Sequence, residues 1–136
     1  MPEPDKSAAP TQLGGREIPA DSSRPGVVHL ASDLLLTSRV AQVCRQRQVP
    51  YRVVGSLQQL TLSRELLGTL LIDLQAPGWN ADAYRQATQQ SPLATRVIAY
   101  AQHVETDLLA AAADLGFETV MTRGQFDARF PQLLPE

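Results

Sequence analysis

Short apolar runs alternate with segments of helical spacing along most of the chain. The apolar runs have the length of β-strands and stand at 27–31, 51–55, 68–74, 95–101 and 118–122. After each run, apolar residues recur every three or four positions, which predicts helices at 32–48, 56–66, 80–90, 103–116 and 124–134. Such an alternation predicts an α/β domain with a parallel sheet and helices on both of its faces.

The predicted helices carry start and stop signals. Ser32 or Asp33 can cap the first helix, and Asn80 can cap the third. Gly116 stands where a left-handed residue often ends a helix. Pro131 falls inside the last helix, which it either bends or cuts short.

Five strands in a chain of this length predict a flavodoxin-like sheet with the strand order 2-1-3-4-5. In this order the strands 27–31 and 68–74 are neighbours, and ligands bind in the crevice at their carboxyl ends. The run 68–74 is apolar almost throughout, as is typical of a central parallel strand, and Asp73 stands near its end. The sequence therefore places Asp73 at the rim where this fold carries its sites.

The first 25 residues differ in composition from the rest. They are rich in Pro, Gly, Ser and Ala, and we expect a disordered N-terminal tail at 1–25 and one folded domain at 26–136. The tail is either a tether or a dispensable extension, and we favour the second interpretation. Lys6, in this tail, is the only lysine of the chain.

Composition limits the classes of function. The net charge of −2 gives no general attraction to nucleic acid or to anionic lipid. We expect no membrane span, because no apolar run approaches 18 residues, and no secretory signal at the N-terminus. The single cysteine, Cys44, excludes an internal disulfide, and its inward position in a helix indicates a core residue. We expect a cytoplasmic protein.

Three stretches carry a resemblance to a known family. They are LLIDLQAP (70–77), VIAYAQH (97–103) and AAADLGFETVMTRGQF (111–126). Together they resemble the receiver domain of response regulators of the chemotaxis-receiver type, over residues 26–134. The resemblance implies that Asp73 is the phosphoacceptor position and Pro77 the loop proline. It also implies a signalling partner, either a histidine kinase or an effector chain.

The sequence departs from the family's pattern at the positions that carry its chemistry. The acidic pair of the family falls on Ala31 and Ser32, with Asp33 one residue later, the hydroxyl falls on Ala101, and the lysine falls on Arg123. The resemblance is therefore to an atypical, degenerate subset. With Asp33 and Asp73 as the remaining carboxylates, it implies weak magnesium binding at most and no other cofactor.

Several candidate residues are expected to line the crevice. The set comprises Ser32, Asp33, Asp73, Pro77, Ala101, His103 and Arg123. For Asp73 we favour a structural ion pair with Arg123 over a working phosphoacceptor. Asp33 is equally consistent with a metal ligand and a helix cap. His103 is either an anion contact or an exposed polar residue, and we favour the second. Trp79 either covers the crevice, marks a partner surface or packs against the domain. We expect His29 to be a packed or edge-facing side chain rather than a ligand.

These expectations combine into one hypothesis with two alternatives. We expect a degenerate receiver-like module without enzymatic activity, which binds a protein independently of phosphorylation. The docking face would be formed by 103–116, 118–122 and 124–134, and the same face would serve a homodimer. One alternative is a functional phosphoacceptor with an atypical metal site. The other is a small-ligand sensor at the crevice.

Overall fold

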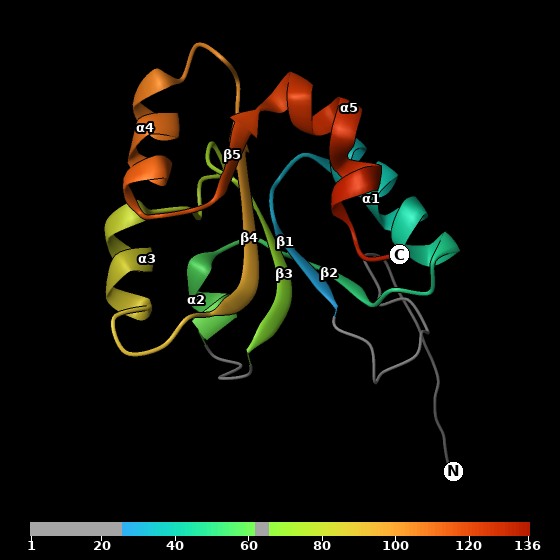
Figure 1. The fold of residues 1–136 in the computed structure, drawn as a ribbon, viewed down its shortest axis with the longest axis horizontal. Coiled ribbons are helices and arrows are strands. Elements are labelled where there is room, and N and C mark those ends of the chain that lie inside the picture. Colours follow the sequence, from blue (N-terminus) through green and yellow to red (C-terminus); the bar gives the residue numbers. More distant parts are fainter. Residues whose placement is uncertain (1–25, 62–65) are drawn as a thin grey trace.

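The computed structural model describes residues 26–61 and 66–136, and the expected tail at 1–25 lies outside these ranges. A sheet stands between two layers of helices (Figure 1). In chain order the elements are β1 Val27–Leu30, α1 Leu34–Gln46, β2 Tyr51–Val54, α2 Leu57–Thr61, β3 Leu67–Asp73, α3 Ala81–Ala87, β4 Ala94–Ala101, α4 Thr106–Asp114, β5 Thr119–Thr122 and α5 Arg123–Leu133. Within the described ranges, no helix is long and apolar enough to cross a bilayer.

The sheet has five parallel strands in the order β2-β1-β3-β4-β5, which confirms the predicted fold. Two register pairs position the site and the core beneath it. His29 of β1 lies opposite Leu71 of β3, and Asp73 of β3 lies opposite Tyr100 of β4. The carboxyl ends of the strands share one edge of the sheet, where β5 passes directly into α5 (Figure 1).

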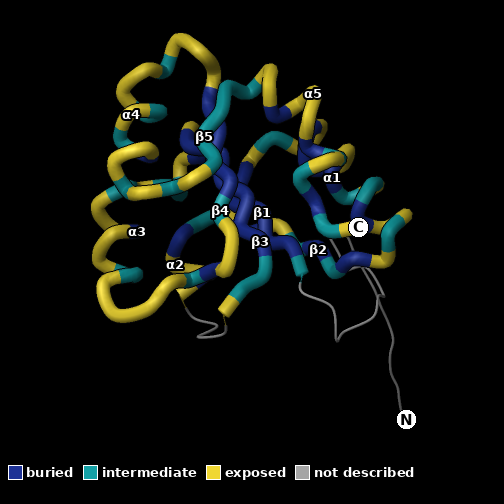
Figure 2. The backbone as a smooth tube through the Cα atoms, viewed as in Figure 1, coloured by how far each residue is buried: buried dark blue, intermediate teal, exposed yellow. Residues whose placement is uncertain are grey.

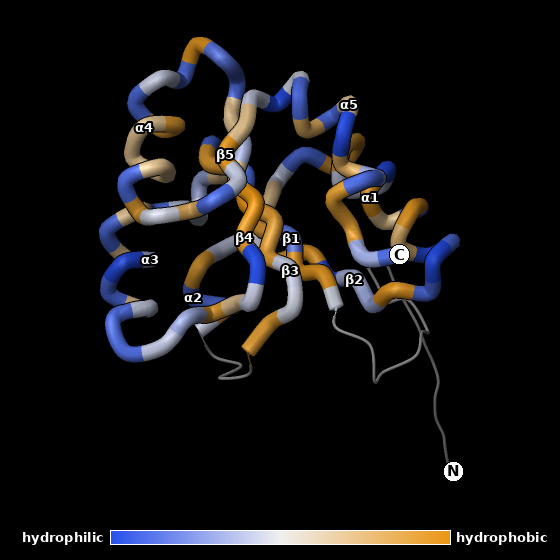
Figure 3. The backbone as a smooth tube through the Cα atoms, in the orientation of Figure 1, coloured by the Kyte–Doolittle hydropathy of each residue, from blue (hydrophilic) through white to orange (hydrophobic). Residues whose placement is uncertain are grey.

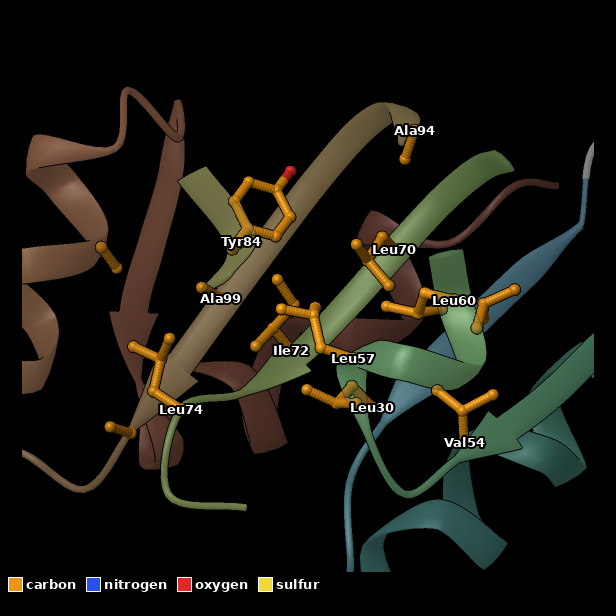
Figure 4. Close-up of a cluster of buried hydrophobic side chains, with 13 residues drawn as sticks. Leu30, Val54, Leu57, Leu60, Leu70, Ile72, Leu74, Tyr84, Ala94 and Ala99 are labelled. Atoms are coloured by element: carbon orange, nitrogen blue, oxygen red, sulfur yellow. The ribbon is translucent and has the colours of Figure 1, made fainter. Parts of the chain in front are cut away.

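Each face of the sheet has its own hydrophobic core. Helices α2, α3 and α4 cover one face, and α1 and α5 cover the other (Figure 1). Side chains of β3 alternate between the two cores, so that Leu70 and Ile72 enter the first and Leu71 enters the second. Figure 4 shows the first core, where Leu70 and Ile72 meet Leu57 and Leu60 of α2.

The burial and hydropathy of the backbone follow the same layers. Buried residues concentrate on the strands, and the outer sides of the helices are exposed (Figure 2). Hydrophobic residues likewise gather along the central strands, with hydrophilic positions on the helices (Figure 3). The predicted apolar run of β3 is therefore a central strand that is covered on both faces, as its composition indicated.

The helix ends follow the predicted signals in most cases. Asp33 caps α1 and Asn80 caps α3, while Gly116 has the positive φ of +90° that its position after α4 required. Pro131 lies inside α5 and does not cut it short, since the helix continues to Leu133. The sequence did not reveal the cap of α5, where Thr122 forms a capping box with Gln125.

Candidate functional site

Asp73 ends β3 as a buried carboxylate, with 6% of its surface exposed. Its Oδ1 accepts a hydrogen bond of 2.9 Å from the backbone N–H of Gln75. Burial raises the pKa of Asp73, while the Gln75 hydrogen bond and the charge of Arg123 act against this shift. No cationic side chain of the described residues forms an ion pair with Asp73. The carboxylate is thus desolvated and only partly compensated.

Asp33 is the second carboxylate of the site and has three donors. Its Oδ1 accepts from the N–H groups of Leu35, at 2.9 Å, and Leu36, at 3.1 Å, and its Oδ2 accepts from Nη2 of Arg123. The hydrogen bond from Arg123 is the main reason that the pKa of Asp33 is lowered, and the Leu36 N–H adds to it. Asp33 therefore caps α1 and holds α5 at the same time.

The expected ion pair between Asp73 and Arg123 is wrong, because Arg123 pairs with Asp33 instead. Arg123 is the first residue of α5, and it meets Asp33 at the start of α1, where both side chains are partly exposed. Asp73 is buried below this rim and binds the backbone of its own turn. The charge of Arg123 still acts on Asp73 through space and on its pKa.

The structure brings only some of the predicted crevice residues together. A hollow of about 460 Å³ is lined by Gln102, His103, Val104, Thr122, Arg123 and Gly124. His103 and Arg123 thus share a cavity, and Asp33 reaches it through its contact with Arg123. Ser32 and Pro77 are both exposed, but neither of them lines this hollow.

Two further residues considered for the crevice, Ala101 and Trp79, are packed against the domain. Ala101 is fully buried at the end of β4, so that position offers a methyl group and no hydroxyl. Trp79 packs against the hydrophobic core beneath α2, α3 and α4, with its ring 5.4 Å from Tyr84 and 6.4 Å from Phe117. Simple packing is therefore the interpretation of Trp79 that the structure favours.

The two carboxylates for which the resemblance implied weak magnesium binding at most, Asp33 and Asp73, are both engaged by other groups. Asp33 is hydrogen-bonded to Arg123 and to two backbone N–H groups, and Ala31 and Ser32 add no carboxylate. Within the part of the chain that the structure describes, no group of three or more His, Cys, Asp or Glu residues could hold a metal ion. Magnesium in proteins is commonly held by one or two carboxylates together with water and phosphate oxygens, so any binding here would have to compete with Arg123 for Asp33.

A buried polar network below the site was not found by sequence reasoning, which expected only a packed histidine. His29 is completely buried, its Nδ1 lies 2.8 Å from the hydroxyl of Tyr51, and its Nε2 lies 2.8 Å from the hydroxyl of Tyr100. Burial lowers the pKa of His29 to about 3, against a smaller opposing effect of Asp33. The alternation of strand residues could have placed these side chains on one face, but not in contact.

Comparison with solved structures supports the fold, whereas the comparisons of sequence find no match. No family model matches the sequence, and no curated protein matches it significantly. Among solved structures, full-length FixJ from B. japonicum is similar with a TM-score of 0.65 and 17% identity, over 81% of this chain and 55% of that one. The signal receiver domain of an HD domain-containing protein from Pseudomonas fluorescens Pf-5 has a TM-score of 0.65 and 18% identity, over 81% and 83%.

A third similar structure is the beryllofluoride-activated NtrC4 receiver domain dimer, with a TM-score of 0.57 and 12% identity, over 79% of this chain and 93% of that one. The chain therefore has the fold of response-regulator receiver domains, as the sequence resemblance implied. Identities this low show the fold alone.

The burial of Asp73 generates a prediction about stability. The variant Asp73→Asn keeps an acceptor for the Gln75 N–H and removes the desolvated charge, so it should raise the free energy of unfolding at pH 7. Urea unfolding measures this difference. The exposed Asp127→Asn is the matched control and should change stability by less than about 0.5 kcal/mol. A loss of stability in Asp73→Asn would show that the carboxylate is stabilising.

The burial of His29 generates a second prediction, about acid. The unfolded chain binds a proton at His29 near pH 6.5 but the folded chain only near pH 3, so between these values the unfolded state holds more protons. The free energy of unfolding should therefore fall as the pH is lowered from 6.5 to 3, by up to about 1.4 kcal/mol per pH unit from this group. His29→Gln should remove this part of the slope in acid–urea titrations.

The exposed His103→Gln is the control, and it should keep the wild-type slope. Asp73 contributes a slope of opposite sign, since its raised pKa favours the folded state in acid, but it is present in all three proteins and cancels in the comparison. Parallel profiles for wild type and His29→Gln would contradict the prediction.

Proposed function

We propose that this chain is a receiver-like signalling module that binds a partner protein without being phosphorylated. The observation that supports this function is the ion pair between Asp33 and Arg123. Arg123 is the basic residue at the end of β5, and its guanidinium is already neutralised by Asp33. A phosphoryl group on Asp73 would have to compete with Asp33 for it.

The energetics of a phosphoryl group at Asp73 support the same conclusion. A phosphoryl group adds a charge of about −1.5 to −2 and needs several charge-assisted hydrogen bonds. Here Arg123, the cation whose charge acts on Asp73, is already paired with Asp33. Ala101 has no hydroxyl, and the only lysine of the sequence is Lys6. Asp73 itself already carries a raised pKa from burial, so added negative charge is disfavoured. We therefore assign no enzymatic activity to the site.

The face made by α4, β5 and α5 is the proposed docking surface. Among the strands that the structure describes, β5 lies at the edge of the sheet and pairs only with β4, and its four residues are all partly exposed. The flanking helices carry exposed residues, among them Ala110 and Ala113 of α4 and Gln125 and Arg129 of α5. An edge strand with exposed helices beside it presents unpaired backbone groups and side chains to a partner.

The proposed partner is another signalling protein, either a histidine kinase or an effector chain, and a second copy of this chain is the alternative. The similar NtrC4 structure is a receiver-domain dimer, which supports an association of this kind. A small-ligand sensor is the weaker candidate, since Trp79 packs away from the predicted crevice.

The response to a phosphoryl mimic tests the proposed function. Amide NMR spectra of labelled protein with magnesium should stay unchanged when beryllofluoride is added, because the site lacks the metal ligands and the free cation that hold this group. A receiver domain that responds to the reagent, measured in the same buffer, shows that the reagent is active. Specific shifts around Asp73 that disappear in Asp73→Asn would instead establish a working phosphoacceptor.

A further inference from the structure

Three buried side chains form a hydrogen-bonded chain across the sheet, beneath α1 and α5. Tyr51 belongs to β2, His29 to β1 and Tyr100 to β4, and both hydroxyls lie 2.8 Å from a ring nitrogen of His29. The chain crosses below β3, which separates β1 from β4 in the sheet. Its His29–Tyr100 half therefore joins β1 to β4, which are not paired with each other in the sheet.

The buried imidazole is neutral at pH 7, because its pKa is lowered to about 3. A neutral imidazole has one N–H and one bare nitrogen, so one tyrosine must donate to His29 and the other must accept from it. Two arrangements satisfy the same heavy-atom positions. In the first, Tyr100 donates to Nε2, and Nδ1–H donates to Tyr51. In the second, Tyr51 donates to Nδ1, and Nε2–H donates to Tyr100.

Burial favours the first arrangement. Whichever tyrosine accepts from His29 keeps a hydroxyl hydrogen for which the described residues offer no other partner. In the second arrangement this hydrogen belongs to Tyr100, which is 0% exposed, and in the first it belongs to Tyr51, which is 6% exposed. An unpaired donor is less unfavourable where water can approach it.

The charge of Asp73 favours the second arrangement. Asp73 is the register partner of Tyr100, and its side chain is on the same face of the sheet, two positions along β3 from Leu71. Burial is the largest cause of the raised pKa of both tyrosines. At Tyr100 the charge of Asp73 adds to this rise in pKa and exceeds the opposing effect of Arg123, whereas the further contribution at Tyr51 comes from Cys44. A negative charge at this end favours the arrangement in which the ring hydrogen of His29 is on Nε2, nearer to Tyr100.

We propose that His29 is a tautomeric sensor of the charge at Asp73. A charged Asp73 increases the population with hydrogen on Nε2, and removal or masking of that charge increases the population with hydrogen on Nδ1. Because the two arrangements differ only in hydrogen positions, the core can change between them without repacking.

The sensor is in direct contact with α5. The ring of Tyr100 is stacked on Phe126 of α5, with 4.3 Å between centroids and 15° between planes, and Phe126 is also 6.2 Å from the ring of His29. Phe126 in turn stacks on Phe130, over which the guanidinium of Arg39 lies at 5.5 Å. The hydroxyl dipole of Tyr100, which differs between the two arrangements, therefore belongs to a ring in contact with α5, at one side of the proposed docking face.

The tautomer of His29 can be measured without a partner and without phosphate, because protonated and bare ring nitrogens resonate far apart. Two-bond ¹⁵N–¹H correlation spectra of the full chain with labelled histidine, at pH 7, should show a change of about twofold or more in the ratio of tautomers between wild type and Asp73→Asn, with Nδ1–H gaining in the variant. The exposed Asp127→Asn should leave the ratio unchanged. Identical His29 nitrogen shifts in wild type and Asp73→Asn would overturn the proposal.

The link to α5 is tested by a second comparison. Asp73→Asn should shift the amide resonances around Phe126, and in a Tyr100→Phe background these shifts should fall to less than half. Shifts of equal size in both backgrounds would show that the effect bypasses Tyr100 and would overturn the link. Since Tyr100→Phe alters a buried hydrogen bond, Tyr51→Phe provides a second variant: it keeps the contact of Tyr100 with Phe126 and should preserve the shifts at α5.

Discussion

The ion pair between Arg123 and Asp33 is the constraint on which the site depends. It joins the first residue of α5 to the residue that caps α1, and so it connects the two helices of one face at the carboxyl end of the sheet. The same contact engages the cation that would otherwise stand free beside Asp73. A contact between two partly exposed groups contributes little to stability on its own, but its position decides which chemistry the rim can perform.

Asp33 and Asp73 have different roles because they are buried to different extents. Asp33 lies at the rim, where it can meet both a helix N-terminus and a guanidinium, and its pKa is lowered as a result. Asp73 lies below the rim, where burial raises its pKa. The charge that remains there is felt by Tyr100, which belongs to a buried network shared by three strands and stacked on α5. The rim and the core are thus connected by side chains of one face.

The sequence predicted the fold well because strand length, helical spacing and capping residues are local signals. The order of the sheet followed from the alternation of strands and helices, and Asp33 and Asn80 were recognised as caps from their types and positions. The partner of Arg123 could not be predicted, because both carboxylates stand near the carboxyl ends of adjacent strands, and the sequence does not show that Asp73 is buried while Asp33 lies at the rim. The contact of His29 with Tyr100 was also beyond sequence reasoning, since it spans 71 positions and crosses an intervening strand.

The central claim, that Arg123 is held by Asp33 and not by Asp73, is tested most directly by double-mutant cycles. Asp33→Asn keeps a good helix cap and removes the charge, so the cycle with Arg123→Gln isolates the ion pair. By urea unfolding we expect a coupling of about 0.5–1 kcal/mol between Asp33 and Arg123, which should weaken with added salt. The coupling between Asp73 and Arg123 should be smaller. A larger coupling for Asp73, or additive effects for Asp33 and Arg123, would contradict this account.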